Sequence, residues 1–288
     1  DFCLSRGLGD VYKRQPQPGT EEPQTGNAQC SEKYLLDRGH VDIKAQPAEG
    51  GFATVLRDDT AQVDKKSVDR KLDDVVLGVH DNALTPRNKK LAGKEFDFLG
   101  KPGERFYHLP QTQDQNIIWP GYNTQDLNYS LTKDNAVNLN LKPTSTPDGA
   151  EWGAFIDGTR GKGFSVLANS AAKDYTIETN FPAHTHTHWA FSKPGLYTFE
   201  ATYTATGTDG KELKSAPQTL TFALGDKTLD SCSFLAPGTT GSGEPNESPT
   251  TKPSAEPSQE PSTQPSAPDT PDTPAHPGRP EEPTGSSF

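Results

Sequence analysis

The sequence of 288 residues contains no methionine and is poor in hydrophobic residues, which make up only 30% of it. Globular chains average nearer 45%, so part of this chain cannot belong to a packed core. No apolar run approaches the roughly 20 residues needed to cross a bilayer. Basic residues are also scarce, because 28 Lys and Arg face 39 Asp and Glu and leave a net charge of −11. Nucleic acid and anionic membranes both require clustered Lys and Arg, so we expect neither as a partner.

The N-terminal residues resemble a remnant of library preparation more than a natural start. Asp10 to Gln15 read DVYKRQ, which the codons GAT GTG TAT AAG AGA CAG encode, and these codons resemble the end sequence of a transposon used for sequencing libraries. We interpret residues 1–15 as a cloning or assembly scar and residues 16–27 as a disordered leader. The scar is excluded from arguments about targeting. A natural glycine-rich tail is the alternative interpretation.

Cysteine is rare, and two of the three cysteines bracket the part of the chain that could fold. Cys3 lies in the suspected scar, whereas Cys30 and Cys232 stand at the two edges of the segment richest in apolar residues. This placement predicts a disulfide formed in an oxidising, extracellular setting. Closing a loop of about 200 residues would stabilise the fold by at most roughly 5 kcal/mol. Two unrelated free thiols are the alternative.

Residues 236–288 have the composition of a disordered stalk rich in Pro, Ser, Thr and Glu. Thirteen of the 26 prolines lie in the last 52 residues, and between positions 245 and 265 a proline recurs at every fourth residue. Such spacing prevents both helix and sheet and favours an extended, solvated chain. We predict a stalk that lifts a domain from a cell surface, with its anchor missing from this sequence. A linker to a further domain is the alternative.

The segment 28–235 shows short alternating stretches separated by Gly, Pro, Asn and Asp, with a helical turn expected only near Lys89–Lys94. This pattern is typical of an all-β domain. We predict an antiparallel, immunoglobulin-like β-sandwich. The predicted strands are His40–Ala45, Phe52–Arg57, Asp74–His80, Arg105–Leu109, Val137–Lys142, Glu151–Ile156, Gly163–Ala168, His184–Phe191, Tyr197–Thr204 and Gln218–Leu224.

Histidine is concentrated in the predicted strand His184–Phe191, which reads HTHTHWAF. Alternation along a strand puts His184, His186 and His188 on one face and the aromatic residues on the other, which must be the core face. Two histidines from one strand, joined by ligands from a neighbour, form a common zinc site. The alternative is a polar outer face that happens to be rich in histidine.

A second set of polar residues follows the same alternation. In the stretch GHVDI, Val41 and Ile43 would point inward, which leaves His40 and Asp42 together on the opposite face. A histidine and a carboxylate placed in this way could ligate zinc or manganese. Alone, this pattern indicates only an ordinary amphipathic strand. It becomes evidence for a metal site because a second set of histidines is present at positions 184–188.

A carboxylate is expected to support His188. If a turn at Ser192–Leu196 pairs Phe191 with Tyr197, the register places Glu200 opposite His188, where it could orient the imidazole.

The remaining histidines and one aromatic motif carry weaker signals. We interpret His108 as a structural or rim residue, His80 as a strand-end residue and His276 as a solvated residue of the stalk. The motif Trp119-Pro120-Gly121-Tyr122 is interpreted as a packed loop corner, with an exposed aromatic platform as the alternative. The sequence contains no phosphate-binding loop, dinucleotide-binding glycine pattern, nucleophile elbow or metalloprotease helix motif.

Several of these motifs, in this order, resemble the actinobacterial surface-anchored domain called choice-of-anchor M. They are LDRGHVD from Leu36, LPQ from Leu109, WPG from Trp119, H-x-H-x-x-WAF from His184 and PG-x-Y from Pro194, and they span nearly the whole segment that could fold.

The resemblance implies a secreted protein tethered to the cell wall or membrane, with genes for a metal-type ABC transporter often nearby. Within that family the first-strand histidine and the H-x-H pair are the recurrent polar positions. The resemblance therefore favours His40, His184 and His186 as metal ligands over His188, with Asp42 or His188 completing the site. The expected partner is a metal ion or metal complex, together with an ABC transporter or its binding protein.

Three functions follow from these observations, in order of preference. The first is a non-catalytic surface protein that binds zinc or manganese, zinc being preferred. The second is a wall-linked adhesin or structural module with an incidental histidine cluster. The third is a zinc hydrolase or lyase, which also needs a positioned acid or base. Neither Glu178 nor Glu200 is marked as such a residue, so we do not predict an enzyme.

Overall fold

The computed structural model describes residues 27–158 and 163–238. The suspected scar, nearly all of the expected leader and nearly all of the expected stalk, including His276, lie outside the described residues. All described residues belong to one compact unit.

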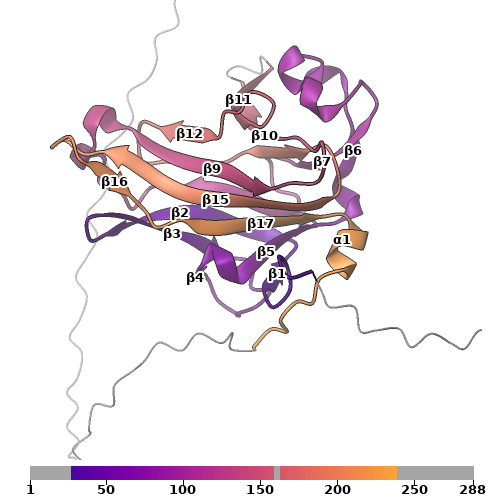
Figure 1. Cartoon of the computed structure of the whole chain (residues 1–288), viewed down its shortest axis with the longest axis horizontal. Helices are drawn as coiled ribbons and strands as arrows, with labels where there is room; N and C mark the ends of the chain where they lie inside the picture. Colours follow the sequence, from indigo (N-terminus) through magenta and orange to yellow (C-terminus); the bar gives the residue numbers. More distant parts are fainter. Residues whose placement is uncertain (1–26, 159–162, 239–288) are drawn as a thin grey trace, which may run out of the picture. The chain divides into compact units, whose positions relative to one another are not determined.

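The described part of the chain is built mainly of β-strands in three sheets (Figure 1). The largest has seven strands in the order β1-β5-β17-β15-β9-β12, with β16 paired to β15. Figure 1 shows β9, β15 and β17 running side by side. The strands of this sheet are β1 (Tyr34–Leu36), β5 (Val75–Val79), β9 (Val137–Ser145), β12 (Thr176–Thr179), β15 (Gly195–Thr206), β16 (Glu212–Lys214) and β17 (Gln218–Leu224).

The other two sheets have five strands each, in the orders β11-β10-β14-β7-β6 and β13-β8-β2-β3-β4. The first contains β6 (Leu84–Pro86), β7 (Arg105–Leu109), β10 (Trp152–Asp157), β11 (Phe164–Asn169) and β14 (His188–Phe191). The second contains β2 (Gly39–Ala48), β3 (Gly51–Asp58), β4 (Val68–Arg70), β8 (Ile118–Asn123) and β13 (His184–His186).

Helices are short throughout the described residues. The expected turn near Lys89–Lys94 is present as two 3₁₀ helices, at Lys89–Leu91 and Lys94–Leu99, but short helices also form elsewhere, so the prediction of a helical turn in that region alone is wrong. No helix in this part of the chain has the length and apolar character that a membrane span requires. The helices are η1 (Leu72–Asp74), η2 (Asp81–Ala83), η3 (Lys89–Leu91), η4 (Lys94–Leu99), η5 (Tyr129–Leu131), η6 (Lys133–Asn135) and α1 (Asp226–Asp230).

The predicted all-β class is confirmed, but the prediction of antiparallel pairing throughout is wrong. Most pairs are antiparallel, whereas β1 with β5, β5 with β17, and β2 with β8 are parallel. Parallel strands need a crossover between them, and the chain between β2 and β8 supplies one that passes through all three sheets. Local alternation fixes which face of a strand is buried but does not fix its partner.

The predicted strands each overlap one observed strand, with one exception. The range His184–Phe191 is divided at Thr187 into β13 and β14, which belong to different sheets. The motif Trp119–Tyr122 lies inside strand β8, so the prediction of a loop corner is wrong.

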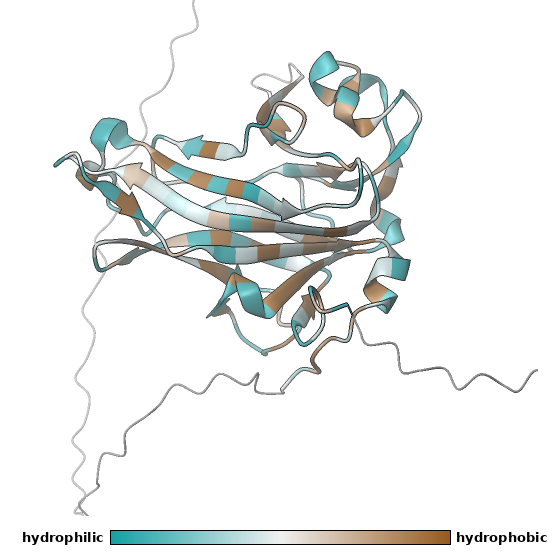
Figure 2. Ribbon diagram, in the orientation of Figure 1, coloured by the Kyte–Doolittle hydropathy of each residue, from teal (hydrophilic) through white to brown (hydrophobic). Residues whose placement is uncertain are grey.

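One main hydrophobic core lies between the sheets. It is formed by the apolar residues that alternate with polar residues along the strands. Figure 2 shows hydrophilic and hydrophobic residues alternating along β9. Large aromatic side chains fill the centre, where Trp152, Trp189, Tyr197 and Phe199 are fully buried. The aromatic residues of β14 therefore face the core, as predicted.

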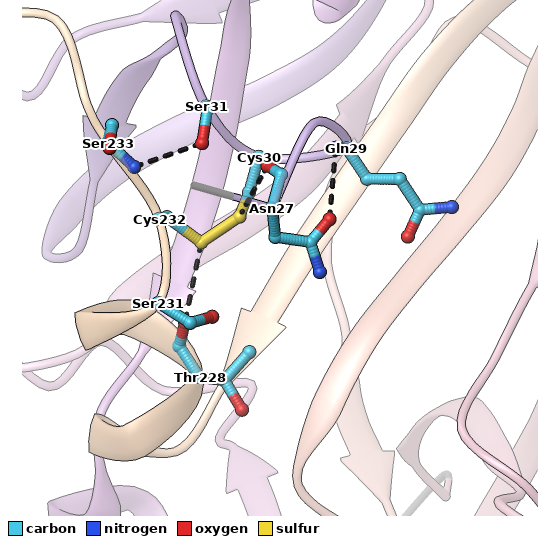
Figure 3. The surroundings of a disulfide bond; sticks show 8 residues. All are labelled: Asn27, Gln29, Cys30, Ser31, Thr228, Ser231, Cys232 and Ser233. Atoms are coloured by element: carbon cyan, nitrogen blue, oxygen red, sulfur yellow. Dashed lines mark hydrogen bonds between the residues drawn. A yellow bond between two sulfur atoms is a disulfide. The ribbon is translucent and has the colours of Figure 1, made fainter. Parts of the chain in front are cut away.

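A disulfide between Cys30 and Cys232 ties the two ends of the described chain together (Figure 3). The predicted pairing is present. Two main-chain hydrogen bonds run beside it: the amide of Glu32 donates to the carbonyl of Ser233 at 2.7 Å, and the amide of Asn27 donates to that of Ser231 at 3.1 Å. The cross-link closes a separation of 202 residues, the long-loop case in which the denatured chain loses most entropy.

His80 directly follows β5, one residue beyond the strand end at which it was predicted, and connects distant parts of the chain. Its Nδ1 lies 2.7 Å from Oδ1 of Asp226 in α1, and its Nε2 lies 3.3 Å from Oδ2 of Asp37, which precedes β2. Burial alone lowers the pKa of His80, but its hydrogen bonds to the two carboxylates outweigh burial and raise it. Protonated His80 therefore links the N-terminal strands to the C-terminal helix.

Candidate metal centre

Three neighbouring strands of one sheet carry the candidate site, with β8 lying between β2 and β13. In the register, His186 is paired with Gly121 of β8, and Gly121 is paired with Asp42 of β2. These residues form one row across the sheet, and side chains in such a row point to the same face. His40 and His184 lie two positions away along their own strands, so they share this face. The two outer strands thus direct four polar side chains at the space above the middle strand.

The space exists because the central position of the row is a glycine. A Cβ at Gly121 would lie 2.6 Å from Oδ1 of Asp42 and 2.9 Å from Cε1 of His186. Both distances are shorter than any normal contact of a carbon atom. Any other residue at this position would occupy the volume across which the ligands approach one another.

The four side chains bring one donor atom each into a cluster that could hold a metal ion, with all four atoms within 4.8 Å of one another. Nε2 of His40 lies 3.0 Å from Nε2 of His186 and 3.3 Å from Nε2 of His184. The carboxylate of Asp42 places Oδ2 at 2.9 Å from Nε2 of His184 and Oδ1 at 3.8 Å from Nε2 of His186. Tetrahedral zinc with bonds of about 2.0–2.1 Å separates its ligand atoms by about 3.3–3.4 Å. The four separations given above, of 2.9 to 3.8 Å and measured to both oxygens of Asp42, lie on either side of that value.

Asp42 is the buried member of the cluster, with 1% of its side chain exposed. Its Oδ1 has no hydrogen-bond donor among the described residues. Burial raises the pKa of Asp42, but its hydrogen bond to His40 and the positive charge of that imidazole outweigh burial and lower it. A buried carboxylate oxygen without a donor is costly unless a cation occupies the site, so this atom fits a metal ligand.

Asp59 fixes the tautomer of His40. Its Oδ2 lies 2.9 Å from Nδ1 of His40, and its Oδ1 accepts a hydrogen bond from Nε of Arg57. A carboxylate only accepts, so in the neutral imidazole Nδ1 of His40 carries the proton and Nε2 is left as the ligand atom. Carboxylates orient metal-bound histidines in this way.

His186 is held in a neutral state. Its side chain is largely buried, and burial lowers its pKa to about 4, with the charge of Asp42 opposing the shift. The imidazole is therefore unprotonated at neutral pH, which is the form that binds a metal.

Trp119 forms one wall of the site instead of an exposed platform. Its ring lies face to face with that of His186, with centroids 3.4 Å apart and planes inclined by 11°. His40 is paired with Trp119 in the register and contacts it at a centroid distance of 5.5 Å.

His188 does not join the other histidines, so the prediction that it shares their face as a ligand is wrong. The chain leaves one sheet for another at Thr187, which ends the alternation on which that prediction depended. His188 lies instead against His108 and Phe155, and its Nε2 is 3.5 Å from Oδ1 of Asp157. His40, Asp42, His184 and His186 are the predicted ligands that the structure brings together.

The predicted role of Glu200 is also wrong. Strand β15 pairs with β17 and β9, not with β14, so Glu200 lies opposite Thr219 and Lys142. Asp157 is the carboxylate near His188.

His108 is structural, as predicted. Its Nε2 lies 3.0 Å from Nδ1 of His188, and its ring stacks on that residue with centroids 5.1 Å apart. Burial lowers the pKa of His108 to about 4.

Three residues that build the site were not predicted from the sequence, namely Gly121, Trp119 and Asp59. Alternation in WPGYN from Trp119 would have placed Trp119 and Gly121 on one face, but the proline argued against a central strand. Asp59 lies immediately beyond β3, where alternation along the strand no longer applies.

Comparisons with known proteins identify no relative: no family model matches the chain, and no curated protein or solved structure matches at a significant level.

Proposed function

We propose that this chain is a secreted, cell-surface metal-binding protein that captures Zn²⁺ through His40, Asp42, His184 and His186. The convergence of three imidazole nitrogens and one buried carboxylate on a single point carries the proposal. An ordinary polar strand face would not be expected to place four donor atoms from two strands around a glycine that leaves room for them.

The donor set favours zinc over manganese. Imidazole suits zinc and other late transition metals, whereas manganese prefers carboxylate, carbonyl and water oxygens. Three of the four donors are nitrogen, and the separations of 3.0 and 3.3 Å between imidazole nitrogens suit a tetrahedral zinc ion.

The site suits capture better than catalysis. Catalytic zinc has three protein ligands and keeps a position for water or substrate, whereas zinc sites without a catalytic role are closed by four protein ligands. Here four protein donors are present. A hydrolase or lyase remains an alternative to test, and so does a wall-linked adhesin in which the cluster has no metal-dependent role.

The surface location and the role in uptake rest on other arguments. A disulfide between Cys30 and Cys232 is compatible with an oxidising, extracellular setting. The resemblance to choice-of-anchor M domains is the reason for proposing a surface tether and an immunoglobulin-like form of the β-sandwich. It is also the reason for proposing a metal ABC transporter or its binding protein as the partner. Metal acquisition is thus the process that we propose for the captured ion.

Metal analysis and calorimetry test the proposal. The purified full chain, stripped with a chelator and titrated with Zn²⁺, should bind one ion per chain. His186→Ala should abolish this binding and leave the fold intact, because the imidazole lies at the edge of the core. His276→Ala is the matched control, since it removes a histidine of the predicted stalk. The absence of stoichiometric zinc binding in the wild-type chain would contradict the proposal, and zinc-dependent turnover of an ester, peptide or phosphate substrate would favour a hydrolase.

A further inference from the structure

We propose that Trp119 is a positioning residue for the metal ligand His186, and that His188 anchors Trp119 through the main chain of Gln111. This inference rests on the proposed function, since it concerns how the same site is held in shape. It assigns a role to a tryptophan that donates nothing to the metal and to a histidine that lies in a different sheet.

The first contact is the stack between Trp119 and His186. The ring centroids are 3.4 Å apart with planes 11° from parallel, so the two rings overlap almost completely. A histidine on a short edge strand such as β13 has one paired neighbour strand to hold its side chain. The indole blocks rotation of the imidazole toward β8 and fixes the plane in which Nε2 points at His40. The wall thereby sets the direction of one metal–ligand bond.

The second contact holds the indole. Nε1 of Trp119 donates to the carbonyl of Gln111 at 2.9 Å. An indole has one polar atom, so a single hydrogen bond at that atom, with the ring packed against His186 and His40, leaves it one orientation. The position of the wall therefore depends on the position of the Gln111 carbonyl.

The third contact holds Gln111. Its main-chain amide donates to Nδ1 of His188 at 3.1 Å, and its side-chain Oε1 accepts from the amide of Asp157 at 2.8 Å. His188 itself is only 9% exposed and is packed against Phe155, at a centroid distance of 4.7 Å, and against His108, at 5.1 Å. Because the amide of Gln111 can only donate, Nδ1 of His188 must be its acceptor. A buried, tightly packed acceptor thus fixes the segment to which Trp119 is attached.

Contacts outside the ligand set commonly change metal affinity by about 10- to 100-fold when they are removed. Metal sites tolerate errors of only about 0.2 Å in ligand distance, so a loose imidazole costs affinity even though every donor atom is still present. The chain of contacts from His188 to Gln111 to Trp119 to His186 would supply that precision.

The experiment measures zinc affinity and the visible absorption spectrum of the Co²⁺-loaded full chain, which reports coordination geometry. Trp119→Ala removes the wall and should weaken zinc binding about 10- to 100-fold and alter the Co²⁺ spectrum. Trp119→Phe keeps an aromatic face but loses the hydrogen bond to Gln111, so its loss should be smaller and in the same direction. His188→Leu removes the acceptor and should weaken zinc several-fold, whereas His188→Asn, which restores an acceptor, should recover most of that loss.

Tyr197→Phe is the matched control, because it removes a hydrogen bond of 2.8 Å to the carbonyl of Lys193 without touching these contacts. It should lower the melting temperature and leave both the zinc affinity and the Co²⁺ spectrum unchanged. Melting of each metal-free variant shows whether it folds. If Trp119→Ala fails to fold, Trp119→Phe and His188→Leu decide the question.

Two results separate this inference from the function on which it rests. A wild-type chain that binds no zinc contradicts the proposed function itself. A wild-type chain that binds zinc, with folded Trp119 and His188 variants that match its affinity and its Co²⁺ spectrum, contradicts the positioning role alone. A spectrum that changes in Tyr197→Phe as much as in Trp119→Phe also overturns it, since the effect would then follow stability and not position.

Discussion

Replacing Gly121 by alanine should destroy the metal site while adding only one methyl group to the protein. Gly121 is the middle residue of the row that joins Asp42 to His186. The new Cβ would approach Oδ1 of Asp42 to 2.6 Å, Cε1 of His186 to 2.9 Å and the carbonyl oxygen of Thr185 to 2.9 Å. Two of these atoms belong to predicted ligands, and the third belongs to β13, the strand that carries His186.

The size of the effect follows from these distances. An ordinary contact of a Cβ lies at 3.4 Å or more, so the carboxylate must retreat by roughly 0.8 Å and the imidazole by roughly 0.5 Å. Both displacements exceed the tolerance of about 0.2 Å for a metal–ligand distance. We therefore expect zinc affinity to fall by about 100-fold or more, which corresponds to about 2.7 kcal/mol. Overpacking itself should cost about 1–3 kcal/mol of folding stability.

The assay is competition for zinc between the protein and a chelating dye, with thermal melting of the metal-free protein beside it. Gly153→Ala is the matched control, because its Cβ would meet Cζ of Phe98 at 2.6 Å in a different sheet. That variant should show a comparable or smaller loss of stability and unchanged zinc affinity. A Gly121→Ala variant that folds and binds zinc within about threefold of the wild type would refute this steric explanation.

Three further predictions concern the disulfide and the titratable groups. Cys30→Ser should lower the free energy of unfolding by up to about 5 kcal/mol in denaturant titrations, given the separation of 202 residues that the disulfide closes, and an unchanged midpoint would count against the cross-link. The pKa of His40 is raised, chiefly by its hydrogen bond to Asp42, so protons compete with zinc as the pH falls through that raised pKa, which lies above 6.5. Affinity at pH 5.5 should then be at least about tenfold weaker than at pH 7.5, and equal affinities would contradict this. Protonated His80 contributes stability that is complete below pH 6.5 and is lost as the pH rises through its raised pKa. The melting temperature of the wild type should therefore fall toward that of His80→Gln as the pH is raised above 6.5, whereas parallel curves would exclude the link.

Alternation along single strands predicted the parts of the site that depend on one strand at a time. It separated His40 and Asp42 from Val41 and Ile43, and the two hydrophobic residues are fully buried. Asp42 is also buried, at 1% exposure, although its predicted face was the outer one. The difference arises because neighbouring strands carry ligands that cover this face, and alternation within one strand contains no information about its neighbours.

The same rule failed at Thr187, where its physical premise ends. Alternation holds only while the backbone remains one extended strand, and the chain changes sheets between His186 and His188. Thr187 is 1% exposed, and composition gives no sign of a break there, since it is a threonine like Thr185 two positions before it. The local sequence pattern of His188 was therefore the same as that of His184 and His186, although His188 lies in a different sheet.

The convergence of the ligands depends on a relation between strands that are far apart in the sequence. Asp42 and His186 meet because β8 lies between their strands in a register that places Gly121 between them, and that register joins a parallel pair to an antiparallel one. A parallel partner is set by the crossover path through the fold, and local pattern carries no information on it. What the sequence does carry is the composition of the row: a carboxylate, a residue without a side chain and an imidazole. Each is ordinary by itself, and the chemistry of the site is created only when folding aligns them.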